Sequence, residues 1–252
     1  PGATVMFSGD LAPRAEHDGK TFFGCSNAPL VINQAIYAKM PYDPEKSFVP
    51  VAGMGKSPLL LVTRPNLGVN TAAELVALGK KEPGKLTMGS ASSGNITHLA
   101  GEYASSQMGF KVTHVPFPGS APAIVSMMGG NVDIMFDALP SSMQQAKAGK
   151  IVPLAIMASQ RFPQLPEVKT PKELGYGSIE ASAWFGGGAP GQAPGARVAV
   201  PAVLLRDRAL HEPELPAALN DGLGYGVPFV GFPHLGAQDL ASKWFKQDAD
   251  AI

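Results

Sequence analysis

The sequence contains a single cysteine, Cys25, so it has no cysteine pair for an internal disulfide and no cluster of thiolates for a metal. Neither His98 nor His114 has a partner at metal-ligand spacing, and we expect neither a metal nor a cofactor. No apolar run reaches the roughly 18 residues that a membrane-spanning helix needs. The chain starts at Pro1 without a signal-peptide pattern, so the natural N-terminus is expected to lie outside this sequence.

The sequence also has no excess of charge of either sign. Lysine and arginine together number 20, aspartate and glutamate together number 20, and the formal net charge is zero. Nucleic acids and anionic membrane surfaces favour basic proteins, so we expect neither as the main partner. The 252 residues are enough for one large domain or two small ones.

Glycine, with 29 residues, and proline, with 24, are abundant, which indicates short elements joined by tight turns. In the middle of the chain, strand-like apolar runs alternate with helix-forming runs. This order predicts a mostly parallel sheet covered by helices. Strands are expected at 85–89, 111–117, 131–137 and 151–158. Helices are expected at 95–109, from Ser120, and over "SSMQQAKAG", where Gly149 can end the helix. Upstream of them, Thr71 and Glu74 form a capping-box pair at the start of a helix.

The flanks of this region are patterned less clearly. "KTFFGCSN" indicates a strand and "PLVINQAIYAKM" a helix, followed by extended segments over 42–65. A crossing rich in glycine and proline occupies 181–195. We therefore expect one lobe formed by residues 58–181 and a second formed by 1–57 together with 182–252.

The stretch "GSASSGNITHLAGEY", residues 89–103, carries the main functional signal. Gly89 and Gly94 have the spacing of a phosphate loop. However, Asn95 and Ile96 stand where such a loop needs a lysine and a serine or threonine. Triphosphate binding is therefore disfavoured.

A catalytic interpretation of the same stretch is also weak. A nucleophile elbow needs a glycine two residues before Ser92, and Ser90 stands there instead. A serine hydrolase that uses Ser92 and His98, with Asp137 as the third member of a triad, stays open as an alternative.

The interpretation that needs no special chemistry is a cradle for an anion. A loop that leads from the carboxyl end of a strand into a helix offers backbone N–H groups and the positive end of the helix dipole. Hydroxyls at Ser90, Ser92, Ser93 and Thr97, with open backbone at Gly94, suit a carboxylate. A plain capped helix start is the simpler alternative.

Two further loops are predicted at the same edge of the sheet. Gly119 and Ser120 lie at a strand-to-helix switch, and Asp137 ends a strand and precedes a helix. Ligands of open parallel sheets bind outside the carboxyl ends of the strands, so the three loops together predict one binding edge. An ordinary turn at Gly119 and a simple helix cap at Asp137 are the alternatives.

Five segments follow one another in the order of a known family. They are "MPYDPEKSFVPVAGMGKSPLLLV", "ELVALGKKEPGKLTMGSASSGNITHLAGEY", "HVPFPGSAPAIVSMMGGNVDIMFDALPS", "AGKIVPLAIMASQRFPQLPEVKTPKELG" and "IEASAWFGGGAPGQAP". The sequence resembles the Bug receptors, the periplasmic solute-binding proteins of tripartite tricarboxylate transporters. The resemblance runs without a large gap from about residue 18 to residue 195.

This resemblance implies an α/β, two-lobed fold like that of type II periplasmic binding proteins. Each lobe would be a mostly parallel sheet flanked by helices, with the ligand in the interdomain cleft. It implies a monomeric periplasmic receptor, without catalysis, that hands a small organic carboxylate to the integral-membrane permease subunits of the transporter. The carboxylate would be a di- or tricarboxylate, an acidic amino acid or an aromatic acid. A ligand sensor with the same fold is a further alternative.

Carried over by position, the resemblance implies that backbone amides and bridging waters hold the carboxylate. One wall of the site would consist of Ser90, Ser92, Gly94, Asn95, Thr97 and His98. The next would consist of Gly119, Ser120 and Ala121, with Asp137 facing the variable part of the ligand. Ser26 and Asn27 would contribute from the other lobe.

The sequence departs from the family pattern at both ends. The family's first strand and its Pro-Gly-Gly-rich loop have no counterpart here, so one βα unit of the first lobe is expected to be missing. Beyond residue 195, where the family has two amphipathic helices, the sequence resembles the family pattern only weakly, and the similarity includes Trp244.

Overall fold

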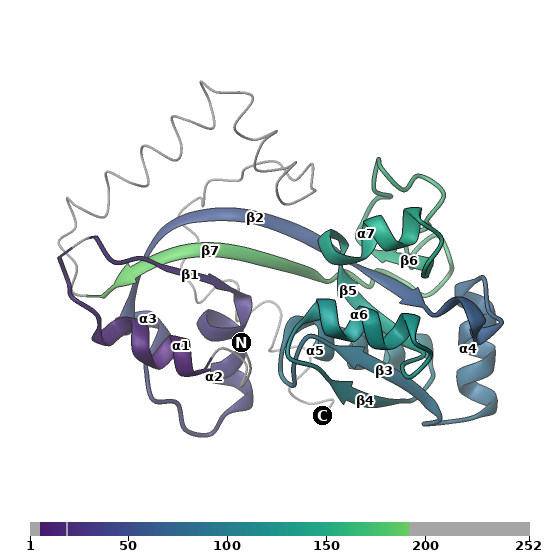
Figure 1. Cartoon of the computed structure of the whole chain (residues 1–252), viewed down its shortest axis with the longest axis horizontal. Coiled ribbons are helices and arrows are strands. Elements are labelled where there is room, and N and C mark those ends of the chain that lie inside the picture. Colours follow the sequence, from purple (N-terminus) through teal and green to yellow (C-terminus); the bar gives the residue numbers. More distant parts are fainter. Residues whose placement is uncertain (1–5, 19, 192–252) are drawn as a thin grey trace. The chain divides into compact units, whose positions relative to one another are not determined.

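The computed structural model describes residues 6–18 and 20–191, which separate into two units (Figure 1). The central unit spans Ser57–Ala183, and the flanking unit includes residues 6–18, 20–56 and 184–191. The chain passes between the units within two strands, β2 (Phe48–Thr63) and β7 (Ser182–Pro190). The sequence-based lobe boundaries were 57/58 and 181/182, and the functional division into lobes stays a prediction.

The central unit contains a mixed sheet. Strand β3 (Leu86–Ser90) lies between β4 (Val112–Pro116) and β5 (Ile134–Ala138) and runs parallel to both. Strand β2 pairs antiparallel with β5 and with β6 (Val152–Met157). Strands β3 to β6 therefore share one direction, as the sequence predicts, and β2 runs against them.

Two helices of the central unit begin at side-chain caps and two begin without one, and the last of them starts at Leu139, two residues before the predicted start at Ser141. Helix α4 (Ala72–Lys81) has the complete capping box of Thr71 and Glu74, and α5 (Ile96–Met108) begins after Asn95, whose side chain accepts from the Thr97 N–H. Helices α6 (Ser120–Met128) and α7 (Leu139–Lys147) follow β4 and β5, and the short η4 (Pro65–Leu67) follows β2. The predicted elements of this region are therefore confirmed. Among the described residues, no helix has the length and apolar content needed to cross a membrane.

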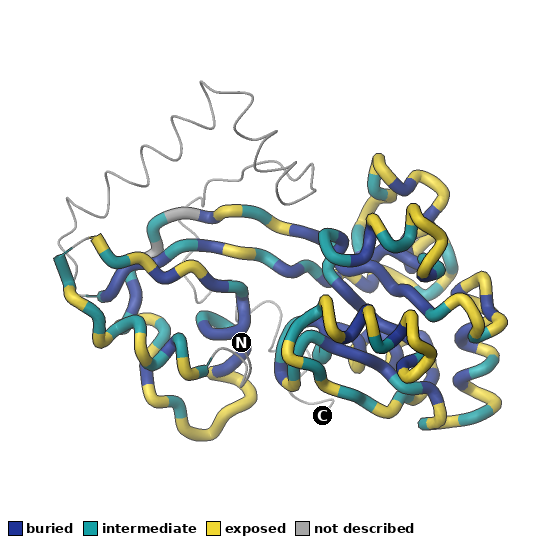
Figure 2. The backbone as a smooth tube through the Cα atoms, in the orientation of Figure 1, coloured by how far each residue is buried: buried dark blue, intermediate teal, exposed yellow. Residues whose placement is uncertain are grey.

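The core of the central unit forms on both faces of the sheet. The consecutive residues Leu59, Leu60, Leu61 and Val62 of β2 are all fully buried, although neighbouring residues of a strand point to opposite faces. A strand buried on both faces reads as an unbroken apolar run, which is the pattern here. Helices α4 and α5 pack on one face through the cluster that includes Leu59, Leu61 and Phe136. Figure 2 shows β3, β5 and β6 as largely buried, whereas β4 and much of the helices are partly or fully exposed.

The described part of the flanking unit contains β1 (Phe23–Ser26), which pairs antiparallel with β7 rather than in the parallel arrangement expected there. Its helical segments are short. They are α1 (Met6–Leu11), η2 (Ala12–Arg14), η3 (Ala28–Ile32), α2 (Asn33–Ile36) and α3 (Pro44–Ser47).

Three expectations for this unit need correction. The helix predicted over 29–40 ends at Ile36, because Tyr37 adopts an extended conformation. The segment predicted as extended from Tyr42 instead begins with α3, because the Asp43 carboxylate accepts from the N–H groups of Glu45 and Lys46. The crossing rich in glycine is largely the strand β7. The region after residue 195, including Trp244, lies outside the described residues.

A partly buried ion pair, Arg64 with Asp133, ties β2, β3 and β5 together at the edge of the sheet where β3 begins. The Asp133 carboxylate accepts from Arg64 Nε at 2.9 Å, and from the N–H and hydroxyl of Thr87 at 2.8 Å each. Burial alone would raise the pKa of Asp133, but the Thr87 hydrogen bonds and the Arg64 charge outweigh it and hold the pKa below its ordinary value. The carboxylate therefore stabilises the native register of these strands while it is ionised.

Replacing Asp133 by asparagine is expected to lower the free energy of unfolding by about 1–3 kcal/mol, because the Arg64 and Thr87 donors lose a charged acceptor. The folded-state pKa of Asp133 lies below that of the unfolded chain, which is about 4. Its contribution is therefore present above that pH and disappears as the pH falls through the folded-state pKa. Urea denaturation between about pH 3 and pH 7 measures both effects.

The control E82Q removes the exposed Lys85–Glu82 pair and should change stability little. A D133N variant as stable as the wild type at neutral pH contradicts this role.

Candidate functional site

The carboxyl ends of β3, β4 and β5 lie at one edge of the central sheet, because these strands are parallel and adjacent. Ser90 at the end of β3 pairs with Pro116 at the end of β4. Each strand is followed by a helix, after a short loop for β3 and β4, and α6 packs against β3, β5 and α7. The candidate residues of the central unit lie at the strand ends, in these loops or in the first helical turns: Ser90, Ser92, Gly94, Asn95, Thr97, His98, Gly119, Ser120, Ala121 and Asp137. We call residues 90–98 together with 119–121 the anion cradle.

Side chains hold the loop between β3 and α5 in shape. The Thr97 hydroxyl accepts from the Ala91 N–H at 2.9 Å, and His98 Nδ1 accepts from the Gly94 N–H at 3.1 Å. Gly94 has φ of 69°, a left-handed conformation that glycine adopts without strain. Within the described part of the chain, the N–H groups of Ser92 and Ser93 have no hydrogen-bond partner. These two N–H groups are therefore free to bind an acceptor.

The first turn of α6 also has N–H groups that no side-chain cap binds. Gly119 precedes it with φ of 136° and ψ of 166°, a conformation that side chains rarely permit, and no side chain caps the helix. The N–H groups of Ser120 and Ala121 belong to the first turn, which has no intrahelical partners for them. Pro122 has no N–H and is tolerated at this position. The first turn of α6 therefore presents donors at the positive end of the helix dipole.

Asp137 lies at the end of β5 and is fully buried. Its carboxylate accepts from the hydroxyls of Ser120 at 2.5 Å, of Ser142 at 2.6 Å, and of Ser141. Burial raises the pKa of Asp137, and the three hydroxyls oppose that effect. Asp137 thus links β5 to the first turns of α6 and α7. It is not a conventional cap of α7, which begins at Leu139 after the N-cap residue Ala138, with no side-chain cap.

Sequence reasoning missed three of these partners. Ser141 and Ser142 follow Asp137 at helical spacing in "DALPSS". That spacing could have identified their hydroxyls as hydrogen-bond donors to the Asp137 carboxylate. His114 lies in β4, and its Nε2 is 2.6 Å from the Ser90 hydroxyl. Only the register of β3 against β4 brings these two residues together.

The geometry does not favour the hydrolase alternative. No hydrogen bond joins Ser92 to His98 among the described residues, and His98 Nδ1 is occupied by the Gly94 N–H. The pair that does form, Ser90 with His114, is a poor catalytic unit. Ser90 is fully buried, and burial together with the neighbouring His98 lowers the pKa of His114 to about 4. A base with so low a pKa accepts a proton weakly at neutral pH.

The candidates in the flanking unit lie at the end of β1. Ser26 is the last residue of the strand and Asn27 is buried immediately before η3. Asn27 Oδ1 has no hydrogen-bond partner among the described residues. A buried acceptor in that condition usually has an unseen donor, such as water or a bound group. A shared site with the anion cradle stays a prediction.

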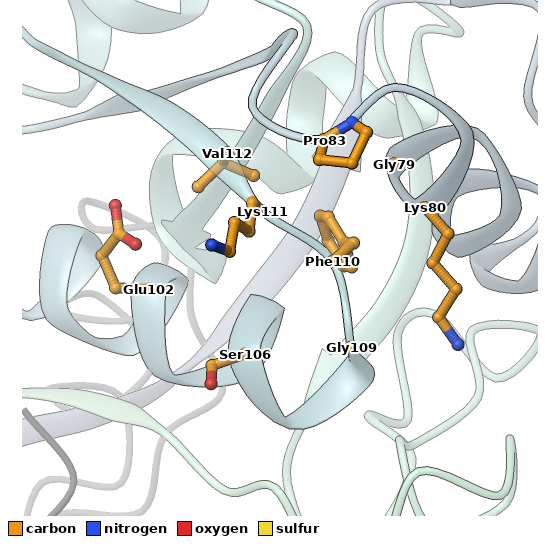
Figure 3. Close-up of a pocket in the computed structure, with 9 residues that line it drawn as sticks. All are labelled: Gly79, Lys80, Pro83, Glu102, Ser106, Gly109, Phe110, Lys111 and Val112. Atoms are coloured by element: carbon orange, nitrogen blue, oxygen red, sulfur yellow. The ribbon is translucent and has the colours of Figure 1, made fainter.

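A separate pocket of about 590 Å³ lies at the opposite end of the central sheet, where β3 and β4 begin (Figure 3). Its lining residues are Gly79, Lys80, Pro83, Glu102, Ser106, Gly109, Phe110, Lys111 and Val112. Figure 3 shows the ammonium groups of Lys80 and Lys111 pointing away from each other, so they do not converge on one anion. The N–H groups of Ser92 and Ser93, which have no partner among the described residues, lie instead in the anion cradle, which stays the predicted ligand site. Within the described ranges, no group of His, Cys, Asp and Glu side chains is suited to hold a metal ion.

Replacing Asp137 by asparagine is expected to lower the free energy of unfolding by about 1–3 kcal/mol, because an amide cannot accept from all three serine hydroxyls. The N–H groups that bond to the first-turn carbonyls of α6 and α7 should also exchange faster, because both helix starts lose their tie to β5. Denaturation and hydrogen exchange measure the two effects. The matched control E167Q changes an exposed carboxylate that has no partner among the described residues. Unchanged exchange at residues 123–126 of α6 in D137N contradicts the linking role.

Known proteins resemble this chain in sequence and in fold. Residues 1–222 match the model of the tripartite tricarboxylate transporter family receptor. Protein BugT of Bordetella pertussis (strain Tohama I) is 33% identical over 190 residues, which cover 75% of this chain. The chain spans 58% of the length of BugT.

Solved structures show the same fold. Rpa4515 of R. palustris, described with adipate, is 28% identical, with a TM-score of 0.88 over 99% of this chain and 84% of that one. MatC of Rhodopseudomonas palustris, described with bound malate, is 26% identical, with a TM-score of 0.83 over 97% of this chain and 84% of that one. These likenesses confirm the α/β periplasmic-binding-protein fold. Together with the family match, they show that this chain belongs to the receptor family of tripartite tricarboxylate transporters.

Proposed function

We propose that this protein is a periplasmic receptor that captures a small organic carboxylate and delivers it, without chemical change, to the permease of a tripartite tricarboxylate transporter. The observation that carries the proposal is the set of free N–H groups at one sheet edge. They come from Ser92 and Ser93 in one loop and from the uncapped first turn of α6. Backbone donors at a helix start bind carboxylates without a cationic side chain.

The charge distribution supports the same conclusion. No lysine or arginine occurs in residues 89–98, 116–123 or 137–143. The anion's charge would therefore be balanced by N–H groups and the dipoles of α5 and α6, not by a guanidinium clamp. Such a site binds and releases its ligand reversibly, which a transport receptor requires.

The Asp137 cluster bears on the kind of carboxylate. The Ser120 hydroxyl donates its hydrogen to Asp137, so its oxygen can only accept from a ligand. A ligand group near Ser120 should therefore be a donor, such as a hydroxyl, an ammonium group or a bridging water. Because relatives are described with adipate and malate, dicarboxylates are the first candidates, and malate adds a hydroxyl.

A thermal-shift screen against mono-, di- and tricarboxylates and acidic amino acids tests the proposal. A ligand present at about 100 times its dissociation constant should stabilise the native state by roughly 2.7 kcal/mol. The A121P variant should lose this stabilisation. Proline removes the N–H of the second helical residue while fitting the first turn of a helix.

The control for A121P is A73P, which makes the same change at the second residue of α4. Both variants should fold, and A73P should keep the full ligand-induced shift. If a well-folded wild type responds to none of these acids, the carboxylate proposal fails. If A121P and A73P respond equally, the ligand does not bind at the start of α6.

A further inference from the structure

Two imidazole rings stack behind the loop of the anion cradle. His98 is in the first turn of α5 and His114 in the middle of β4, and their ring centroids lie 3.6 Å apart with the planes inclined by 14°. Both rings are partly buried, which lowers the pKa of each. The pKa of His114 falls to about 4, through burial and the proximity of His98. His114 is therefore neutral throughout the physiological pH range.

Each ring holds one group of the loop. His98 Nδ1 accepts from the Gly94 N–H at 3.1 Å, and His114 Nε2 is 2.6 Å from the Ser90 hydroxyl. An imidazole nitrogen that accepts from an N–H carries no proton, so neutral His98 has its hydrogen on Nε2. That nitrogen faces Glu102 Oε1 at 3.9 Å.

Few other ionisable groups surround the pair. Helix α5 carries His98, Glu102 and Tyr103, and β4 carries His114. Helix α5 also packs against β3 and β5; β3 has no ionisable side chain, and β5 has Asp137, which accepts from three serine hydroxyls. Glu102 and Asp137 are therefore the carboxylates on these elements, and burial raises the pKa of each.

Protonation of His98 would convert Nδ1 from an acceptor into a donor. The Gly94 N–H and the Nδ1–H would then face each other across the 3.1 Å that now separates the two nitrogens. Two donors so close require a common acceptor, and an anionic oxygen is the acceptor best suited to both. A positive charge on His98 would attract that anion, and neutral His114 would not oppose the charge.

We propose that His98 is a proton-linked ligand of the bound carboxylate, so that anion binding at the cradle takes up a proton on this imidazole. The inference rests on the proposed function and adds a specificity rule to it. An acid whose carboxylate reaches both the Gly94 N–H and His98 Nδ1 binds more tightly as the pH falls. An acid held only by α6 shows no such dependence. By linkage, the affinity rises by up to about tenfold for each unit that the pH falls, in the range between the His98 pKa of the complex and the His98 pKa of the free protein.

Isothermal titration calorimetry of the full chain with adipate and with malate measures the proton count. Titrations at about pH 6.5, 7.2 and 8 are run in two buffers of different ionisation enthalpy. The difference in heat between the buffers gives the number of protons bound. We expect proton uptake by the wild type, and an affinity that increases toward pH 6.5.

The variant H98N separates this role from a structural one. The asparagine amide oxygen can still accept from the Gly94 N–H, but it cannot be protonated. The affinity of H98N should therefore fall to that of the wild type at high pH, with no proton uptake and a flat pH profile. The same substitution at a histidine of the flanking unit, H17N, is the control and should keep the wild-type uptake. Binding by the wild type without proton uptake, or unchanged uptake in H98N, overturns this inference and leaves the proposed function standing. Absence of binding by both acids removes the proposed function and this inference with it.

Discussion

The Asp137 carboxylate is buried at the end of β5, where the hydroxyls of Ser120, Ser141 and Ser142 donate to it. The binding edge depends on this interaction. A buried carboxylate is costly unless hydrogen bonds compensate it, and here the compensating groups are in the first turns of two helices. The cost of burying Asp137 therefore fixes where α6 and α7 begin relative to the sheet. The free N–H groups of α6 keep their position for the same reason.

The loop between β3 and α5 is fixed in a different way. Its shape is maintained by neutral groups, the Thr97 hydroxyl, the Asn95 amide and the His98 imidazole, each of which accepts from a nearby backbone N–H. These bonds satisfy some loop donors and leave those of Ser92 and Ser93 free. In the proposed function, such a site would attract an anion by oriented dipoles and one titratable ring. Its affinity would then respond to pH in a way that an arginine clamp would not.

Much of the central unit was predictable because its signals are local. The capping box of Thr71 and Glu74, the cap at Asn95 and the buried run of β2 each depend on residues close in sequence. The flanking unit was less predictable. Asp43 starts a single helical turn inside a segment with a strand-like pattern. The glycine-rich run becomes β7 because two strands distant in sequence, β1 and β2, pair with it. Propensity alone does not reveal such pairing, since it is decided by distant residues.

The sequence by itself determined the family, the alternation of strands and helices, and the positions of the loops that end β3, β4 and β5. These features follow from hydrophobic periodicity and short-range capping, which are encoded within a few residues. Only the tertiary structure decided which polar groups meet. The contacts of Ser90 with His114 and of Ser120 with Asp137 join residues separated by 24 and 17 positions. Strand register and helix packing bring them together, because a buried polar group must find its partner wherever the fold places one.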